Sequence, residues 1–253
     1  MLDLTGKVYF HMAGGDWQCS GSVVNDGGRA GYSLVLTAGH CSIDETTGEF
    51  ATNWMFMPNW DRQPATFPTA CSGSYYGCWT AVGIYVHYGF ANAGAFNNQA
   101  VTHDWGFAVV GPGGKNNTQL DALGSYPIQF LGGVATGNRL EAFGYPAAGK
   151  YHGNDLTWCA GKIFVDVSSS NGSSNNATWG MGCDMTGGAS GGPWFESLNE
   201  SNGTGGVLSS LNSYGYSGIR NMYGPKFNAN TQATYGAASS TTTPSNQVIG
   251  TAP

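Results

Sequence analysis

Residues 34–41 read LVLTAGHC, and residues 186–194 read TGGASGGPW. The first stretch is an apolar, strand-like run that ends in a small-residue turn presenting His40. The second stretch sets Ser190 among glycines, which let the backbone turn its amide groups inward without Cβ clashes. A third stretch, residues 103–110, places Asp104 at the mouth of another apolar strand. The three stretches together supply an imidazole, a carboxylate and a hydroxyl.

Short strand-like runs recur along the rest of the chain. Clusters of Gly, Asn, Asp, Ser or Pro separate them, as turns require. The runs cover residues 8–10, 21–24, 32–36, 54–57, 81–86, 106–110, 140–144, 162–167 and 206–211. Because helical periodicity is scarce, the pattern predicts an all-β protein, either a β-sandwich or barrels.

Breaks in this pattern predict the organisation of the chain. Residues 111–114 read GPGG directly after a strand, so we expect a linker over residues 116–123. The expected units are residues 1–122, residues 123–236 and a tail over residues 237–253. This tail is rich in Ala, Ser, Thr and Pro, which predicts fraying. Residues 168–178 (SSSNGSSNNAT) predict a low-complexity surface loop.

Composition excludes several classes of protein. Of 253 residues only 9 are Lys or Arg, and the net charge of −6 offers no cluster of cations to a nucleic acid. No apolar run approaches the roughly 20 residues that span a bilayer. The chain is 41% hydrophobic and 13% aromatic, which argues against disorder.

The cysteines indicate the compartment. They stand at positions 19, 41, 71, 78, 159 and 183, without C-x-x-C or zinc-site spacing. Disulfides are therefore favoured, and with them an oxidising compartment and a secreted protein, although the pairing stays open. Residues 1–13 lack the features of a secretory signal, so we expect a trimmed or recombinant start. Glycosylation sequons begin at Asn116, Asn171, Asn176, Asn199 and Asn202.

The order of the three chemical groups separates possible reaction types. Taken alone, the segment around Ser190 is equally well explained as a plain glycine-rich turn. Residues 188–192 match the G-x-S-x-G elbow of α/β-hydrolases, but no histidine follows Ser190, so that interpretation fails. The subtilisin order could use Asp16, His40 and Ser190, but its α/β scaffold contradicts the strand pattern. The order His40, Asp104, Ser190 fits chymotrypsin.

Longer stretches then show a family resemblance. CSGSVV (19–24), LVLTAGHC (34–41), HDWGFAVV (103–110) and GGASGGPW (187–194) resemble the chymotrypsin/trypsin clan of secreted serine endopeptidases. GYP (144–146), LTWCAGKI (156–163) and LNSY (211–214) are most similar to its microbial trypsin-like and glutamyl-endopeptidase-like branches. The similarity runs from about residue 6 to residue 235.

The resemblance implies a fold and a set of roles. The fold would be two six-stranded antiparallel β-barrels with the active site between them. His40 would be the general base and then the general acid, and Asp104 would fix its tautomer and stabilise the imidazolium. Ser190 would be the nucleophile, and the amides of Gly188 and Ser190 would form the oxyanion hole.

The resemblance also implies covalent links and partners. The expected disulfides are Cys19–Cys41, Cys71–Cys78 and Cys159–Cys183. The substrate would be a protein or peptide, hydrolysed by a monomer without a metal or organic cofactor.

Two positions depart from the family pattern. Ala189 replaces the Asp that pairs with the freed amino terminus in trypsin-like enzymes, which puts that mode of activation in doubt. Asp184 lies six residues before Ser190, where a carboxylate would select a substrate Arg or Lys, but Thr186 replaces a bracing cysteine nearby. Ser209 and Asn212 are further candidates for substrate binding. Glutamyl specificity ranks below basic specificity, because no histidine lies in the strand after the nucleophile.

Two other classes of function stay open. A proteolytically inactive, protease-like binding or effector protein would keep the motifs without catalysis. A carbohydrate-binding β-sandwich is suggested only by composition and tryptophan content.

Overall fold

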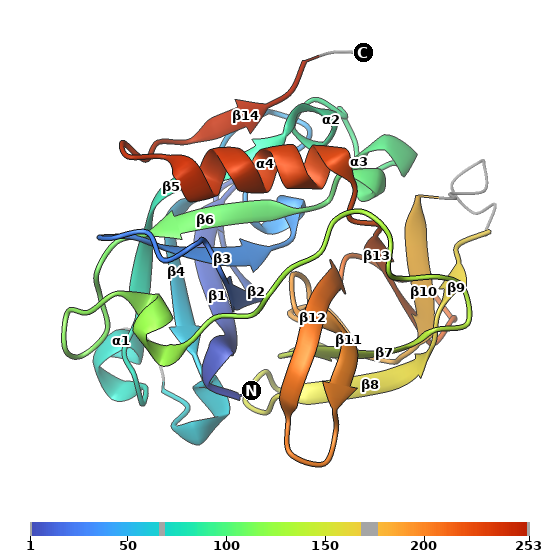
Figure 1. Ribbon diagram of the computed structural model, residues 1–253, viewed down its shortest axis with the longest axis horizontal. Coiled ribbons are helices and arrows are strands. Elements are labelled where there is room, and N and C mark those ends of the chain that lie inside the picture. Colours follow the sequence, from blue (N-terminus) through green and yellow to red (C-terminus); the bar gives the residue numbers. More distant parts are fainter. Residues whose placement is uncertain (1, 66–68, 168–176, 252–253) are drawn as a thin grey trace.

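The computed structural model describes residues 2–65, 69–167 and 177–251 (Figure 1). The strands up to residue 110 are β1 (Thr5–Met12), β2 (Gly15–Val24), β3 (Ser33–Thr37), β4 (Thr52–Pro58), β5 (Trp79–His87) and β6 (Gly106–Val110). Short helices precede β1, connect the strands or follow β6: η1 (Leu2–Leu4), η2 (Gly39–Cys41), η3 (Trp60–Arg62), α1 (Ala70–Gly73), α2 (Tyr88–Ala91), α3 (Asn98–Thr102) and η4 (Leu120–Leu123). The later elements are β7 (Arg139–Gly144), β8 (Thr157–Lys162), β9 (Phe164–Val165), β10 (Thr178–Gly182), β11 (Pro193–Asn199), β12 (Thr204–Leu211), β13 (Asn221–Pro225), α4 (Ala229–Ser240) and β14 (Gln247–Ile249).

The first six strands close into a barrel. They pair in the order β5-β4-β1-β2-β3-β6, and a further pairing of β5 with β6 completes the ring. Alternating residues of these strands fill the interior, so that Val8, Val35, Phe56, Val86 and Phe107 are all fully buried. The expected all-β class is confirmed, and the expected strand runs of this half lie within or overlap observed strands.

Strand register brings the segments that carry His40 and Asp104 to one edge of this barrel. In the antiparallel pair of β3 and β6, Thr37 lies opposite Gly106. The segment that leaves β3 and the segment that enters β6 therefore meet at the same edge. His40 stands on the first segment and Asp104 on the second.

The second half is also built from strands. A four-stranded sheet has the order β12-β11-β7-β8, and a three-stranded sheet has the order β13-β10-β9. Pro193, the first residue of β11, lies opposite Leu211, the last residue of β12. The segment that enters β11 and the segment that leaves β12 therefore meet at the same edge of the sheet. The second six-stranded barrel stays a prediction, because the described strands of this half form two separate sheets.

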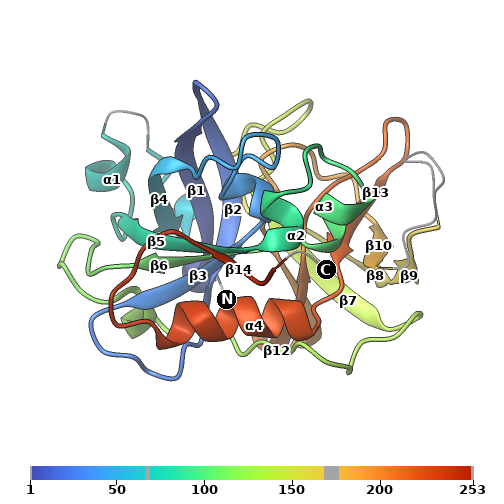
Figure 2. The ribbon, with the colours of Figure 1, turned by 90° about the horizontal axis from the view of Figure 1, so that it is seen from above.

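Regular elements continue beyond residue 237 to residue 249, so the expected fraying is wrong there; residues 252–253 of the expected tail lie outside the described residues. Helix α4 spans residue 237 and packs against β5 and β6, and β14 adds a parallel strand to β5 beyond it (Figure 2). Asn228 and Thr231 form a capping box that starts the helix. The Arg29 guanidinium donates to the carbonyl oxygens of Ala238 and Thr241 near its end, at 2.8 and 3.0 Å.

The structure describes the expected linker completely but the expected surface loop only in part. The expected linker over residues 116–123 contains the short helix η4. Residues 168–176 of the expected surface loop lie outside the described residues, and Thr178 already belongs to β10. Within the described ranges, no helix combines the length and the apolar character needed to cross a membrane.

Candidate active site

His40 and Asp104 are joined by two hydrogen bonds. The Asp104 carboxylate accepts from the backbone amide of His40 at 2.9 Å through Oδ1 and from its ring Nδ1 at 2.8 Å through Oδ2. Asp104 is fully buried, and the His40 side chain is 25% exposed. A Cβ atom on Gly39 would lie 2.9 Å from the Phe90 ring and 3.0 Å from Asp104 Oδ1, so only glycine fits before the histidine. The two hydrogen bonds between His40 and Asp104 fix the orientation of the imidazole.

Ser213 completes this network from the other half of the molecule. Its hydroxyl donates to Asp104 Oδ2 at 2.5 Å, the same oxygen that accepts from His40. Ser213 follows β12 by two residues, at the edge where β12 pairs with β11. Sequence reasoning missed this residue, although the quoted stretch LNSY contains it, because a single serine in a Ser-rich chain gives no signal.

The Ser190 segment lies against the turn that carries His40. The Ser190 carbonyl accepts from the Ser20 amide at 2.7 Å. A Cβ atom on Gly191 would lie 2.7 Å from the Ala38 amide nitrogen, so the backbone beside Ser190 touches the residue two positions before His40. The structure thus brings the segments of His40, Asp104 and Ser190 together.

Two backbone amides near Ser190 have no acceptor. Neither the Gly188 nor the Ser190 N–H donates to another residue in the ranges that the structure describes. Gly188 has a φ of 99°, a left-handed conformation that favours glycine. Ser20 Oγ donates to the Gly188 carbonyl at 2.8 Å and holds the peptide in place. Unpaired N–H groups of this kind can bind an anionic oxygen.

Electrostatics suit His40 to proton transfer. Burial by itself lowers the pKa of the imidazole, but the charge of Asp104 and the hydrogen bond to it outweigh burial. The net result is a His40 pKa above its usual value. The ring also lies edge-on to Phe96, with centroids 5.6 Å apart. His103, the chain neighbour of Asp104, does not join this network: its ring stacks on that of His87, with centroids 4.6 Å apart.

The Asp184 carboxylate already has partners from the chain itself. It accepts from Lys150 Nζ at 2.6 Å and from the Tyr151 hydroxyl at 2.8 Å, and its side chain is 38% exposed. The hydrogen bond from Lys150, followed by that from Tyr151, lowers the pKa of Asp184. Thr186 braces the same loop, because its hydroxyl donates to the Ala148 carbonyl at 2.8 Å.

The side chains of Asn212 and Ser209 are engaged within the protein. Asn212 is fully buried, donates to the carbonyls of Phe143 and Ala189, and accepts from Trp194 Nε1. It therefore braces the loop that carries Ser190. The Ser209 hydroxyl accepts from Gln129 Nε2 and donates to the Val207 carbonyl, and it lines a separate cavity of about 180 Å³.

Three disulfides confirm the implied pairings: Cys19–Cys41, Cys71–Cys78 and Cys159–Cys183. Cys19 and Cys41 lie with His40 in the one cluster of three potential metal ligands found among the described residues. Their sulfur atoms are bonded to each other, so this cluster offers no thiolate to a metal.

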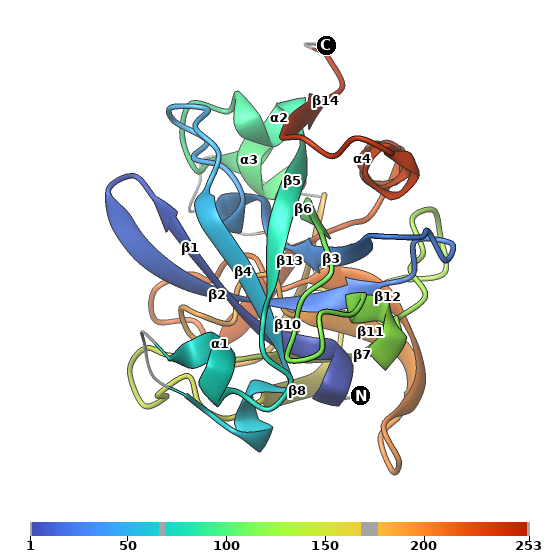
Figure 3. The ribbon, with the colours of Figure 1, turned by 90° about the vertical axis from the view of Figure 1, so that its left-hand side faces the viewer.

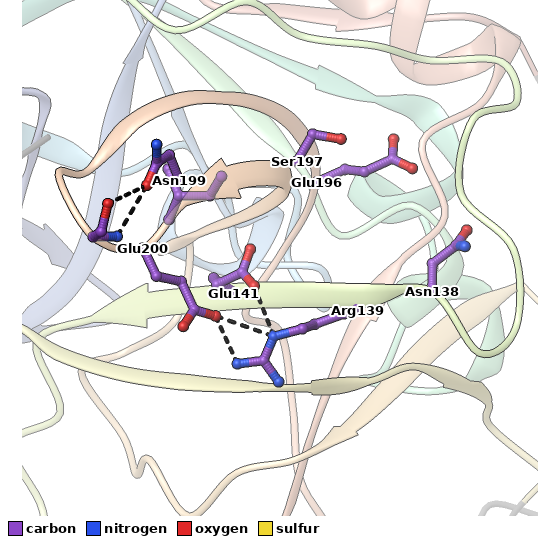
Figure 4. A pocket seen from close by; sticks show the side chains of 9 residues that line it. Asn138, Arg139, Glu141, Glu196, Ser197, Asn199 and Glu200 are labelled. Carbon is purple, nitrogen blue, oxygen red and sulfur yellow. Dashed lines mark hydrogen bonds and ion pairs between the residues drawn. The ribbon is translucent and has the colours of Figure 1, made fainter.

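A second cavity of about 640 Å³ lies beside β7 and β11 and contains several acidic side chains (Figure 4). Glu141 is 3% exposed, and Arg139 Nε lies 3.4 Å from its carboxylate. The Arg139 guanidinium also binds Glu200 Oε1 at 2.6 Å. Burial, followed by the hydrogen bond and charge of Glu200, raises the pKa of Glu141 to about 7. Glu141 is thus a buried acid that titrates near neutrality.

Comparisons with known proteins agree with this geometry. A thermostable serine protease, AL20, from an extremophilic microorganism shares 36% identity, with 95% of this chain and 98% of that chain covered and a TM-score of 0.76. The protease Anisep from Arthrobacter nicotinovorans shares 34% identity, with 95% and 97% covered and a TM-score of 0.75. A Glu endopeptidase shares the fold at 18% identity, with 93% and 90% covered and a TM-score of 0.64. No family model and no curated protein sequence matches the chain.

Proposed function

Because the chain belongs to the chymotrypsin/trypsin-like serine proteases, we propose that it is a secreted serine endopeptidase acting through His40, Asp104 and Ser190. The observation that carries the proposal is the hydrogen-bonded pair of His40 and Asp104 beside the Ser190 segment. The three disulfides support an oxidising, extracellular site of action.

In the proposed reaction His40 moves the proton and Ser190 makes the covalent bond. The neutral imidazole takes the proton from Ser190 Oγ as this oxygen attacks the scissile carbonyl carbon. The carbonyl oxygen becomes an oxyanion, which the Gly188 and Ser190 amides bind. His40 then gives the proton to the leaving amine as the C–N bond breaks, and an acyl-enzyme remains. Water attacks this ester by the same steps and releases the acid.

Asp104 and Ser213 prepare His40 for this task. The Asp104 carboxylate accepts a hydrogen bond from Nδ1–H of His40, which keeps the proton on Nδ1 and leaves Nε2 as the base. The carboxylate also stabilises the imidazolium that forms. We assign Ser213 as a positioning residue, because it contacts Asp104 and acts on the imidazole only through that carboxylate.

The specificity proposal is a preference for Arg or Lys before the scissile bond, carried by Asp184. Lys150 holds this carboxylate at 2.6 Å, so a substrate cation has to compete with it. The preference is therefore expected to be modest.

The two-barrel architecture is part of the same proposal. Residues 1–122 supply His40 and Asp104, residues 123–236 supply Ser190, and the active site lies between them. Each chain acts as a monomer on protein or peptide substrates. Activation does not use a salt bridge at position 189, because Ala189 has no charge.

Hydrolysis of casein by purified protein tests the proposal. Ser190→Ala is expected to remove nearly all activity, while Ser72→Ala, which alters an exposed serine of α1, keeps it. A folded wild-type protein that neither hydrolyses casein nor reacts with a fluorophosphonate would support the alternative, an inactive protease-like binding protein.

A further inference from the structure

Lys7 is a buried amine that the proposed reaction does not use. It lies on β1, is 3% exposed, and places Nζ 4.9 Å from the Tyr9 ring centre and 4.8 Å from that of Trp60. In the part of the chain that the structure describes, Nζ has no hydrogen-bond acceptor and no ion-pair partner. Lys7 thus contacts two aromatic rings but no anion among the described residues, and a largely buried cation without an anion is costly.

A second unpaired donor lies beside it. The amide nitrogen of Gln18 on β2 is buried and has no acceptor among the described residues. A methyl group on Gly153 would lie 3.2 Å from Lys7 Nζ and 3.0 Å from Gln18 Nε2. One on Gly188 would lie 2.9 Å from the same Gln18 nitrogen. The Gln18 nitrogen therefore lies next to the backbone proposed to bind the oxyanion, and Lys7 Nζ lies with that nitrogen beside Gly153.

Their position identifies the part of the substrate that they face. His40 gives its proton to the leaving amine, so the segment after the scissile bond lies on the His40 side of Ser190. Cys41 follows His40 and is bonded to Cys19, the neighbour of Gln18. The leaving segment therefore passes Gln18.

A cavity lies farther along the same hairpin, beside Trp17, the chain neighbour of Gln18. It measures about 340 Å³ and lies along the β1–β2 hairpin, which projects from the barrel in Figure 3. Its lining includes Tyr9, Trp17 and Met55, and Trp17 is 55% exposed. The cavity also contains Asp16, whose carboxylate is paired with His11 Nδ1 at 2.8 Å.

We propose that Lys7 and Gln18 bind the carboxylate of an Asp or Glu at the first or second substrate position after the scissile bond. The inference rests on the proposed endopeptidase function and adds a preference on the leaving-group side. The ammonium and the amide N–H would make charge-assisted and neutral hydrogen bonds to the same carboxylate. The following substrate residues would occupy the cavity beside Tyr9 and Trp17.

Other ionisable groups near Lys7 do not supply this anion. Tyr9 is a phenol whose pKa is raised by burial to about 12, so it is neutral. Tyr145 is also neutral, because burial and the charge of Asp61 raise its pKa. Asp61 accepts from the Tyr145 hydroxyl at 2.9 Å rather than from Lys7. Burial lowers the pKa of Lys7 to about 8, so the amine is mostly charged at pH 7.

The test compares peptides that differ only in Glu or Gln at the first or second position after the cleaved bond. At pH 7 we expect kcat/KM for the better-placed Glu peptide to exceed its Gln partner by about tenfold, as a charge-assisted bond predicts. In Lys7→Met the ratio should fall to within about twofold of one, with cleavage of the Gln peptide retained. Lys162→Met, which removes an exposed lysine of β8, should leave the ratio unchanged.

A second measurement needs no variant. In the wild type the Glu/Gln ratio should fall as the pH rises above about 8, because Lys7 loses its charge. A ratio near one at pH 7, a ratio independent of pH, or a ratio that Lys7→Met leaves unchanged would overturn the inference. Fluorophosphonate titration separates the two proposals: unlabelled protein without hydrolysis contradicts the endopeptidase function, whereas labelled protein without Glu preference contradicts only the role of Lys7.

Discussion

Ser213 and His40 share one oxygen atom of Asp104: the serine hydroxyl donates to Oδ2 at 2.5 Å and the imidazole Nδ1 at 2.8 Å. Ser213 comes from the second half of the chain and Asp104 from the first. The orientation of the His40 imidazole therefore depends on how the two halves meet.

Removal of the Ser213 hydroxyl should slow the reaction. We expect Ser213→Ala to lower kcat/KM by about tenfold or more, because a hydrogen bond to a charged group contributes about 1.5–3 kcal/mol. The acid limb of the pH profile should move to higher pH, since Asp104 then attracts the imidazole proton more strongly. Ser210→Ala removes a neighbouring buried hydroxyl bonded to the Pro225 carbonyl and is the control. If both variants shift the limb equally, Ser213 has only a structural role.

The pH dependence of the wild type reports His40. Its pKa lies above the usual 6.5, and the imidazole must be neutral to act as a base, so kcat/KM should rise with a midpoint above pH 6.5. Asp104→Asn removes the charge that raises the pKa, so the midpoint should move down while kcat falls by orders of magnitude. A rate that is flat from about pH 4 to 9 would contradict the assignment of His40 as the base.

Lys150 should restrain a preference for basic substrates. Lys150→Ala frees the Asp184 carboxylate, so we expect the kcat/KM ratio of Arg to Gln peptides at the position before the cleaved bond to rise several-fold. Asp184→Asn should bring the ratio close to one. Equal ratios in the wild type and both variants would remove Asp184 from the substrate pocket. Cleavage sites in a peptide library, read by mass spectrometry, would then show which side chain is preferred.

Glu141 should make stability depend on pH. Its folded pKa of about 7 lies above the unfolded value of 4.5, so the folded state binds more protons in this window and loses stability as the pH rises through it. Glu141→Gln cannot lose that proton, so we expect it to exceed the wild type by about 1–2 kcal/mol in free energy of unfolding at pH 8, with little difference at pH 5. Glu200, whose pKa Arg139 lowers, is retained in both proteins. Chemical denaturation of both proteins at both pH values measures this difference. The same difference in free energy of unfolding at pH 5 and at pH 8 would contradict this account.

The sequence was most informative where chemistry and strand pattern coincide. The sequence predicted an apolar strand leading to His40 and another starting after Asp104, and the register of β3 and β6 brings these two ends to one sheet edge. Disulfides were also predictable, because the cysteines had no metal-site spacing. The pairings needed the family resemblance.

The features of the fold and of the site that the sequence did not predict depend on tertiary contacts that local sequence does not encode. Residues 229–240 read ANTQATYGAASS, with little apolar periodicity, and the helix owes its ends to the Asn228 capping box and to Arg29 from far away. Lys150 and Asp184 are 34 positions apart, and nothing in either neighbourhood predicted their ion pair. The proximity of Lys7 and Gln18 beside Gly153 was likewise not predictable from the sequence, because the two residues carry no shared motif.

Mapping of the fluorophosphonate adduct by mass spectrometry tests the central claim most directly, because the reagent reacts only with a hydroxyl that a neighbouring base activates. We predict one adduct per chain, located on Ser190, and its loss in His40→Ala. An adduct on another residue, or undiminished labelling of Ser190 in His40→Ala, would show that these two side chains do not act as a pair.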